Sequence, residues 1–129
     1  MPDIGTFDTI VFFHVLEHIS NPELFLNNCK KLLKRNGCII AEVPNYDNFQ
    51  IRLNKFYRDF YWQRAHLSYF NPKSITTVFK KSGLKNRKII GIQQYSIENM
   101  VSWKLTSKPQ LDEPTYNLPK QYNWIETHY

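Results

Sequence analysis

The stretch FDTIVFFHVLEHISNP, residues 7–22, decides how this chain of 129 residues is interpreted. Residues 8–13 are almost all apolar and rich in β-branched and aromatic side chains, which is typical of a strand covered on both faces. Asn21 and Pro22 are a helix-capping residue and a proline suited to the first helical position. The stretch therefore predicts a buried strand, a short connection and a helix.

The same pattern of helix start and stop signals occurs twice along the chain. A capped proline start, apolar residues at helical spacing and a basic last turn predict helices near residues 21–35 and 72–82. The first helix is expected to close in a left-handed stop at residues 34–37. Apolar, β-branched runs after the helices predict strands near residues 38–43 and 84–93. This order indicates an α/β fold with a mainly parallel sheet.

An aromatic insert, residues 44–71, separates the two strand–helix units. Within it, residues 51–62 have a helical pattern. The insert is too apolar for a simple connecting loop and too irregular for a core helix, so we expect that it forms a lid over a pocket. Residues 97–105 predict a short helix, and residues 106–129 predict an irregular tail that contains three prolines.

The composition excludes several classes of protein. Hydrophobic residues make up 42% of the chain, which favours a folded core over disorder. No apolar run is long enough for a membrane helix and the first residues do not form a signal peptide, so we expect no membrane association and a cytoplasmic location. The net charge is +6, but the lysines gather at predicted helix ends, which disfavours a nucleic-acid partner. Cys29 and Cys38 are expected to be reduced core thiols.

Three motifs follow one another in a fixed order: HVLEH after the first strand, EVPN at the end of the second, and HLSYFNP before the second helix. Together they resemble the class I S-adenosylmethionine-dependent methyltransferases over about residues 6–105. The resemblance implies that residues 1–105 are the C-terminal half of a Rossmann-like domain. It implies S-adenosylmethionine as the cofactor and methyl transfer to oxygen of a small molecule such as a sugar or a metabolite.

The resemblance also marks what this sequence lacks. In the family, a glycine-rich loop after the first strand receives the methionine part of the cofactor, and an acid after the second strand holds the ribose. The four glycines here form no G-x-G arrangement. We therefore expect a fragment that is inactive alone, with an exposed strand edge through which it self-associates. The alternatives are a non-catalytic remnant or interaction module, and half of an RNA methyltransferase.

The candidate ligand contacts come from the rule that ligands lie beyond the carboxyl ends of the strands in open α/β sheets. By the resemblance, the residues beside the cofactor are Phe13, His14 and Val15. The candidate substrate contacts are Asn45, Tyr46 and Trp62.

The candidate catalytic residues are His66 and His18. If residues 14–18 form a helical turn, His14, Glu17 and His18 share one face, and the resemblance places His66 over the same pocket. Related small-RNA 2′-O-methyltransferases bind a divalent metal at a similar E-x-x-E-H turn, and quinone-biosynthesis O-methyltransferases have such a turn too. Because His14 replaces the first glutamate, the donor set here is softer, and both a metal and purely structural roles stay open.

Overall fold

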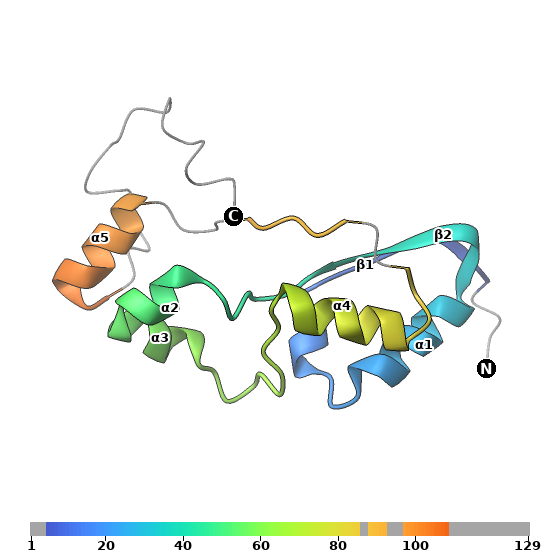
Figure 1. Cartoon of the computed structure of the whole chain (residues 1–129), viewed down its shortest axis with the longest axis horizontal. Coiled ribbons are helices and arrows are strands. Elements are labelled where there is room, and N and C mark those ends of the chain that lie inside the picture. Colours follow the sequence, from blue (N-terminus) through green and yellow to red (C-terminus); the bar gives the residue numbers. More distant parts are fainter. Residues whose placement is uncertain (1–4, 86–87, 93–96, 109–129) are drawn as a thin grey trace, which may run out of the picture. The chain divides into compact units, whose positions relative to one another are not determined.

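A computed structural model of the chain describes residues 5–85, 88–92 and 97–108. The described residues group into two compact units (Figure 1). The first unit comprises residues 5–46 and 64–85, and the second comprises residues 47–63, 88–92 and 97–108. Each unit has a hydrophobic interior of its own.

The first unit is built on two parallel strands, β1 (Phe7–Phe13) and β2 (Leu33–Glu42) (Figure 1). Their register is regular from the Thr9–Cys38 pair to the pair of Phe13 with Glu42. Both strands therefore end at the same edge. The predicted α/β class and parallel order are confirmed.

The first predicted helix ends earlier than the sequence indicated. Helix α1 spans Pro22–Lys31, and the residues expected in its last turn already belong to β2. The left-handed position is Asn36, with a φ of 68°, rather than Gly37. Gly37 is needed for space instead, because a Cβ there would lie 3.0 Å from the backbone oxygen of Lys34.

The second predicted helix is confirmed as α4 (Pro72–Lys81), together with both of its predicted ends. At its start, Asn71 Oδ1 accepts from Ser74 N at 2.8 Å, and Ser74 Oγ accepts from Asn71 N at 2.9 Å. This reciprocal pair is a capping box. At its end, Gly83 has a φ of 66° and its N–H donates to the Lys80 oxygen at 3.0 Å, as a left-handed stop requires.

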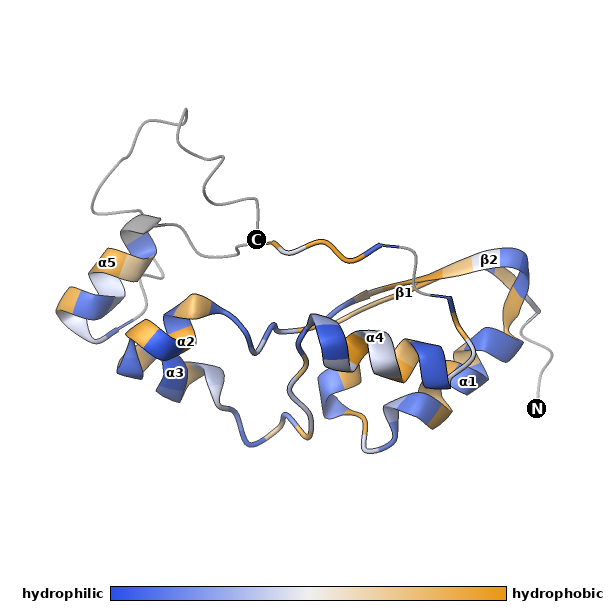
Figure 2. Cartoon of the chain, viewed as in Figure 1, coloured by the Kyte–Doolittle hydropathy of each residue, from blue (hydrophilic) through white to orange (hydrophobic). Residues whose placement is uncertain are grey.

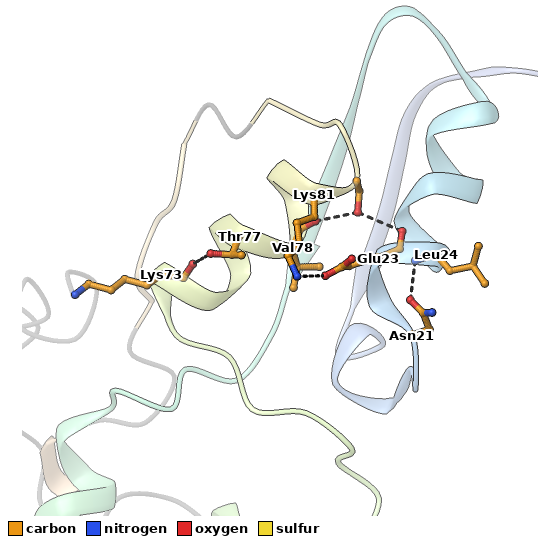
Figure 3. Close-up of polar contacts among 8 residues, drawn as sticks. Asn21, Glu23, Leu24, Lys73, Thr77, Val78 and Lys81 are labelled. Atoms are coloured by element: carbon orange, nitrogen blue, oxygen red, sulfur yellow. Dashed lines mark hydrogen bonds and ion pairs between the residues drawn. The ribbon is translucent and has the colours of Figure 1, made fainter.

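Helices α1 and α4 pack on the same face of the two-stranded ladder (Figure 1). Lys81 Nζ pairs with the Glu23 carboxylate at 3.0 Å (Figure 3), and Ser82 Oγ donates to the Glu23 backbone oxygen at 3.2 Å. The core between the helices and the strands centres on Leu16, Leu26 and Phe70. This core holds the connection after β1 in place.

The opposite face of the ladder is apolar and exposed. Val11, Phe13 and Ile40 are 50%, 56% and 49% exposed, and they alternate with Phe12 and Ile39, which pack against the core. Figure 2 shows hydrophobic colouring along both strands. In the described residues, β1 pairs with β2 alone. The expectation that residues 8–13 are covered on both faces is therefore wrong in the described structure. Pairing of the β1 edge with another chain stays a prediction.

The third predicted strand, residues 84–93, is not found in the described part of that segment. Residues 84–85 and 88–92 take part in no described strand, and residues 86–87 and 93 lie outside the described residues. Ile90 and Ile92 are largely exposed. β-branched residues favour a strand only where a neighbouring strand accepts them, which explains why their pattern misled here.

In its described residues, the second unit has three short helices, α2 (Phe49–Leu53), α3 (Lys55–Tyr61) and α5 (Ile97–Thr106). The single helix expected over residues 51–62 is divided at Asn54. The Asn54 side-chain oxygen accepts from the N–H groups of Phe56 and Tyr57 at 3.0 and 3.3 Å, so Asn54 caps the start of α3. The same residue is the C-cap of α2.

The core of the second unit is aromatic and centres on Trp103 of α5, which is 1% exposed. Its ring meets those of Tyr57 and Phe60 edge to face, with centroids 5.0 Å apart in both pairs. The helix predicted near residues 97–105 is confirmed. The lid role of the insert stays a prediction, and the predicted tail lies outside the described residues beyond Lys108.

Both cysteines are free thiols, as predicted. Cys29 is buried, and this burial raises the pKa of its thiol. Cys38 is exposed on the open face of the ladder, so its predicted core position is wrong. Among the described residues, no helix is long and apolar enough to cross a membrane.

Candidate active site

The chain leaves β1 through a strained turn at His14. The His14 N–H donates to the backbone oxygen of Glu42 at 3.0 Å, which extends the hydrogen bonding between β1 and β2 by one bond. Its φ of 52° then turns the backbone away from the sheet, a conformation that costs free energy in a non-glycine residue. A short 3₁₀ turn, Leu16–His18, follows, and fully buried Leu16 anchors it in the core.

The imidazole of His14 lies between two carboxylates. Its Nδ1 is 3.4 Å from Glu17 Oε1, and its Nε2 is 3.3 Å from Glu42 Oε1. The sequence interpretation missed Glu42 as a site residue. The sequence could have indicated Glu42, because this residue ends β2 at the same edge at which β1 ends, and ligands bind beyond that edge in open α/β sheets.

Glu17 is the buried centre of the site. Its side chain is 1% exposed, and no described residue makes a hydrogen bond to either of its carboxylate oxygens. Its backbone oxygen accepts from Leu67 N at 2.8 Å and from Ser68 N at 3.1 Å. These bonds hold the end of the insert against the turn that carries Glu17.

A hydrogen bond fixes the tautomer of neutral His18. Its Nδ1 lies 2.8 Å from the backbone oxygen of Ala65. Because a carbonyl oxygen only accepts, Nδ1 must carry the proton, and Nε2 is left with a lone pair. The ring of His18 also meets that of His66 with centroids 4.9 Å apart.

His66 is held in a partly buried position between His18 and Tyr69, whose ring centroid is 5.4 Å from its own. Its Nδ1 is buried and has no hydrogen-bond partner among the described residues. This burial lowers the pKa of His66 below its ordinary value of 6.5, against the opposing pull of the Glu17 carboxylate. His66 is therefore neutral near pH 7.

Of the four residues that the sequence grouped, the structure brings together the Glu17 carboxylate and the imidazoles of His18 and His66, without His14. One donor atom each from Glu17, His18 and His66 lies within 4.8 Å of the others. We call these three residues the EHH cluster. A neutral imidazole beside a carboxylate can accept a proton from a substrate, and three such donors can also hold a divalent cation.

The other predicted site residues lie elsewhere in the first unit or, in one case, in the second unit. Asn45 forms a parallel bridge with Phe70, and Tyr46 N donates to the Phe70 oxygen at 2.7 Å. Val15 precedes the 3₁₀ turn, while the Phe13 side chain lies on the exposed face of the ladder.

Trp62 belongs to the second unit, where its exposed ring contacts Tyr61. Its predicted contact with the substrate, like those of Asn45 and Tyr46, stays a prediction. The same holds for the cofactor contacts predicted at residues 13–15.

Comparisons with known proteins give one matching family model and three curated relatives. A family model described as a methyltransferase domain matches residues 2–89, which include the whole EHH cluster. An uncharacterized protein of Methanocaldococcus jannaschii is 29% identical over 64% of this chain and 40% of its own length. Ubiquinone biosynthesis O-methyltransferases of Pelagibacter ubique and Maricaulis maris are each 24% identical, over 83% and 78% of this chain and 46% and 42% of their own lengths.

The chain therefore spans less than half the length of these curated relatives. No solved structure gives a significant match.

Proposed function

The chain belongs to the methyltransferase domain family, and on this premise we propose that the domain of which it is part transfers a methyl group from S-adenosylmethionine to oxygen of a small molecule. A sugar or a metabolite hydroxyl fits this class. The EHH cluster, at the carboxyl edge of the parallel strands, carries the proposal. Two relatives named O-methyltransferases support an oxygen acceptor.

A hydroxyl acceptor needs activation because it is a weak nucleophile. We assign this role to His66, whose lowered pKa keeps it neutral and ready to take the hydroxyl proton. The buried Glu17 carboxylate stabilises the imidazolium that forms, and His18 holds the segment that carries His66 through its bond to Ala65. Bound S-adenosylmethionine supplies the electrophilic methyl group, so positioning contributes much of the rate.

The residues present fit half of a cofactor site. The edge after β1 offers the exposed ring of Phe13 near the turn at His14, and an aromatic ring can stabilise a sulfonium charge. The sequence contains no G-x-G loop for the methionine part. We propose that this chain by itself has only a weak affinity for S-adenosylmethionine.

Calorimetric titration of the purified chain with S-adenosylmethionine is expected to show no saturable heat in the micromolar range. The physical reason is that the backbone N–H groups of a glycine-rich loop, which would bind the carboxylate end of the cofactor, are absent. Injection of the cofactor into buffer is the control. A dissociation constant of micromolar order would contradict the proposed half-site.

A second candidate role for the EHH cluster is to hold a divalent cation. A buried carboxylate without hydrogen bonds is costly, and a cation would compensate it. The Nε2 lone pair of His18 is available, and its Nδ1–H is bound to a carbonyl oxygen, as is usual for metal-binding histidines. Glu17, His18 and His66 would be the ligands, and such a cation would lower the pKa of a bound hydroxyl.

Titration with Co²⁺, followed by its visible absorption, distinguishes the two roles. If the cluster holds a cation, the chain binds one Co²⁺, and Glu17→Gln, His18→Ala and His66→Ala each weaken binding by about tenfold or more. His128→Ala is the matched control, because His128 is the histidine furthest along the chain from the cluster. Equal, weak Co²⁺ binding by the wild type and His66→Ala would exclude the cation-binding role and leave the general-base role as the proposal.

A further inference from the structure

The second unit has an apolar hollow between α2 and α5, and both helices carry hydrophobic segments (Figure 2). We call it the α2–α5 hollow. Its volume is about 350 Å³, and its apolar wall comes from Leu53, Met100, Val101 and Leu105. Leu53 is 66% exposed and Leu105 is 70% exposed. Side chains exposed to this degree forgo the free energy that burial would provide, so a segment that covered them would be stabilised there.

The exposed wall of the hollow forms a stripe on the outside of α5. Val101 and Leu105 are four residues apart and therefore lie on one face of the helix, whereas Trp103 is 1% exposed and belongs to the core. Helix α5 thus has apolar side chains on its outer face as well as on its inner face. The packing of the described residues uses only the inner one.

A positive charge borders this apolar surface. The exposed Lys104 belongs to the lining, and no carboxylate lies among the described lining residues. Lys104 forms no ion pair with any described residue. The chemistry that complements this surface is therefore an apolar side chain next to a negative charge.

The hollow is small for a partner that must associate from solution. Seven described residues line it, whereas each side of a standard interface between proteins has about 20–30 residues. A segment of the same chain avoids most of the loss of translational and rotational freedom, and its effective concentration is of millimolar order. A segment that is attached close to the hollow is therefore the better match.

The sequence directly after Lys108 has the complementary chemistry. Leu111 is followed at once by Asp112 and Glu113, so one apolar side chain is next to two carboxylates. Over residues 109–129 the acidic residues outnumber the single lysine. These residues lie outside the described part of the chain, and their composition is opposite in charge to the lining of the hollow.

The length of the connection allows Leu111 to reach the hollow. Helix α5 ends at Thr106, and Val101 lies about 8 Å from that end along the helix axis. Residues 109–111 can span about 10 Å when they are extended. A chain that turns back after α5 therefore brings Leu111 level with the apolar stripe.

We propose that residues 111–113 of this chain dock on the α2–α5 hollow. Leu111 covers the side chains of Leu53 and Leu105, and the carboxylates of residues 112 and 113 lie beside Lys104. The contact is intramolecular and does not depend on the EHH cluster.

Methyl NMR of the full chain tests the contact directly. We expect nuclear Overhauser effects between the methyl groups of Leu111 and those of Leu53 or Leu105. They should persist in a mixture of labelled and unlabelled chains when the experiment selects contacts within one molecule. Contacts only between molecules would mean that a second copy occupies the hollow, and the absence of any contact would mean that the segment does not dock; either result overturns the proposal.

Two leucine variants of the full chain test the apolar part. Leu111→Ser should accelerate amide hydrogen exchange in α5 by about tenfold, because the apolar stripe returns to water. Leu118→Ser is the matched control, since it is also a leucine after α5 but has no neighbouring acid, and it should change exchange in α5 by less than about twofold. Exchange in β1 and β2 should be unchanged in both variants. Equal exchange of α5 in the two variants would contradict the docking of Leu111.

A charge reversal tests the polar part. Lys104→Glu should accelerate exchange in α5 by about threefold, the scale of an exposed ion pair. Adding Asp112→Lys and Glu113→Lys to Lys104→Glu should restore the rate of the wild type, because the opposite charges meet again. Failure of this rescue would overturn the placement of the two carboxylates beside Lys104.

Discussion

Replacing His66 by glutamine is expected to lower the kcat of the complete methyltransferase by about 10²- to 10⁴-fold, the usual contribution of a general base. Glutamine keeps the polar character of the position but cannot take the proton of the acceptor hydroxyl. KM should change little, because the EHH cluster acts on the reacting hydroxyl rather than on the rest of the substrate. Transfer of labelled methyl from S-adenosylmethionine to the acceptor measures the effect.

The pH dependence separates a base from a merely structural histidine. Burial lowers the pKa of His66 below 6.5, so the neutral base persists into mildly acidic solution. The acid limb of kcat/KM, which reports groups of the free enzyme, should therefore lie below pH 6.5 and should be missing in His66→Gln. Because the pKa of His66 is lower in the folded chain than in the unfolded chain, His66 contributes to the free energy of unfolding above its unfolded pKa. This contribution is lost as the pH falls through the folded pKa.

A matched histidine variant controls for the loss of an imidazole in general. His128→Gln should keep both the rate and the acid limb; His128 is the histidine furthest along the chain from the EHH cluster. If His66→Gln retained full activity, the base role would be lost and Glu17 and His18 would need another explanation.

The parts of the fold that the sequence predicted are those fixed by local chemistry. Asn71 before Pro72 and Gly83 after a basic turn predict where α4 begins and ends, and the structure confirms both. Capping depends on hydrogen bonds within a few residues, so it can be read without knowledge of the tertiary structure. The β1–β2 ladder was predictable for a related reason, because a helix between two apolar runs favours a parallel crossover.

The errors concern features that need a distant partner. The run with Ile90 and Ile92 has a strand composition, but in the described residues no strand pairs with it. A left-handed stop of the first helix was expected at residues 34–37; Asn36 does have a positive φ of 68°, but it lies in β2 rather than at the end of α1. What Gly37 avoids is contact with the backbone oxygen of Asp8 across the ladder, at 3.1 Å from a Cβ built there, which spacing alone does not reveal.

In the candidate site, too, local features were predictable and features that depend on tertiary packing were not. The sequence predicted that His14, Glu17 and His18 share one face and that His66 lies over the same pocket. In the structure, one donor atom each from Glu17, His18 and His66 lies within 4.8 Å of the others, without His14. The geometry differs, because the turn is 3₁₀ and His14 lies outside it with a positive φ. Burial of Glu17 and the contact of His14 with Glu42 depend on the packed ladder, so only coordinates reveal them.

Replacing Trp103 by alanine is expected to reduce the stability of the second unit by about 3–5 kcal/mol, the usual cost of deleting a large aromatic core side chain. Trp103 is 1% exposed, and its two edge-to-face contacts, with Tyr57 and Phe60, would be lost with it. A loss of this size is a large part of the total stability of a small domain. Amide hydrogen exchange in α3 measures it directly.

Trp62 provides a matched control within the same unit, since it is also a tryptophan but is 45% exposed. Trp62→Ala should cost less than about 1 kcal/mol, as exposed substitutions usually do. In Trp103→Ala, exchange should accelerate in α3 but not in β1 and β2, because the two units have separate cores. Equal effects of the two substitutions would mean that Trp103 does not hold α5 against α3.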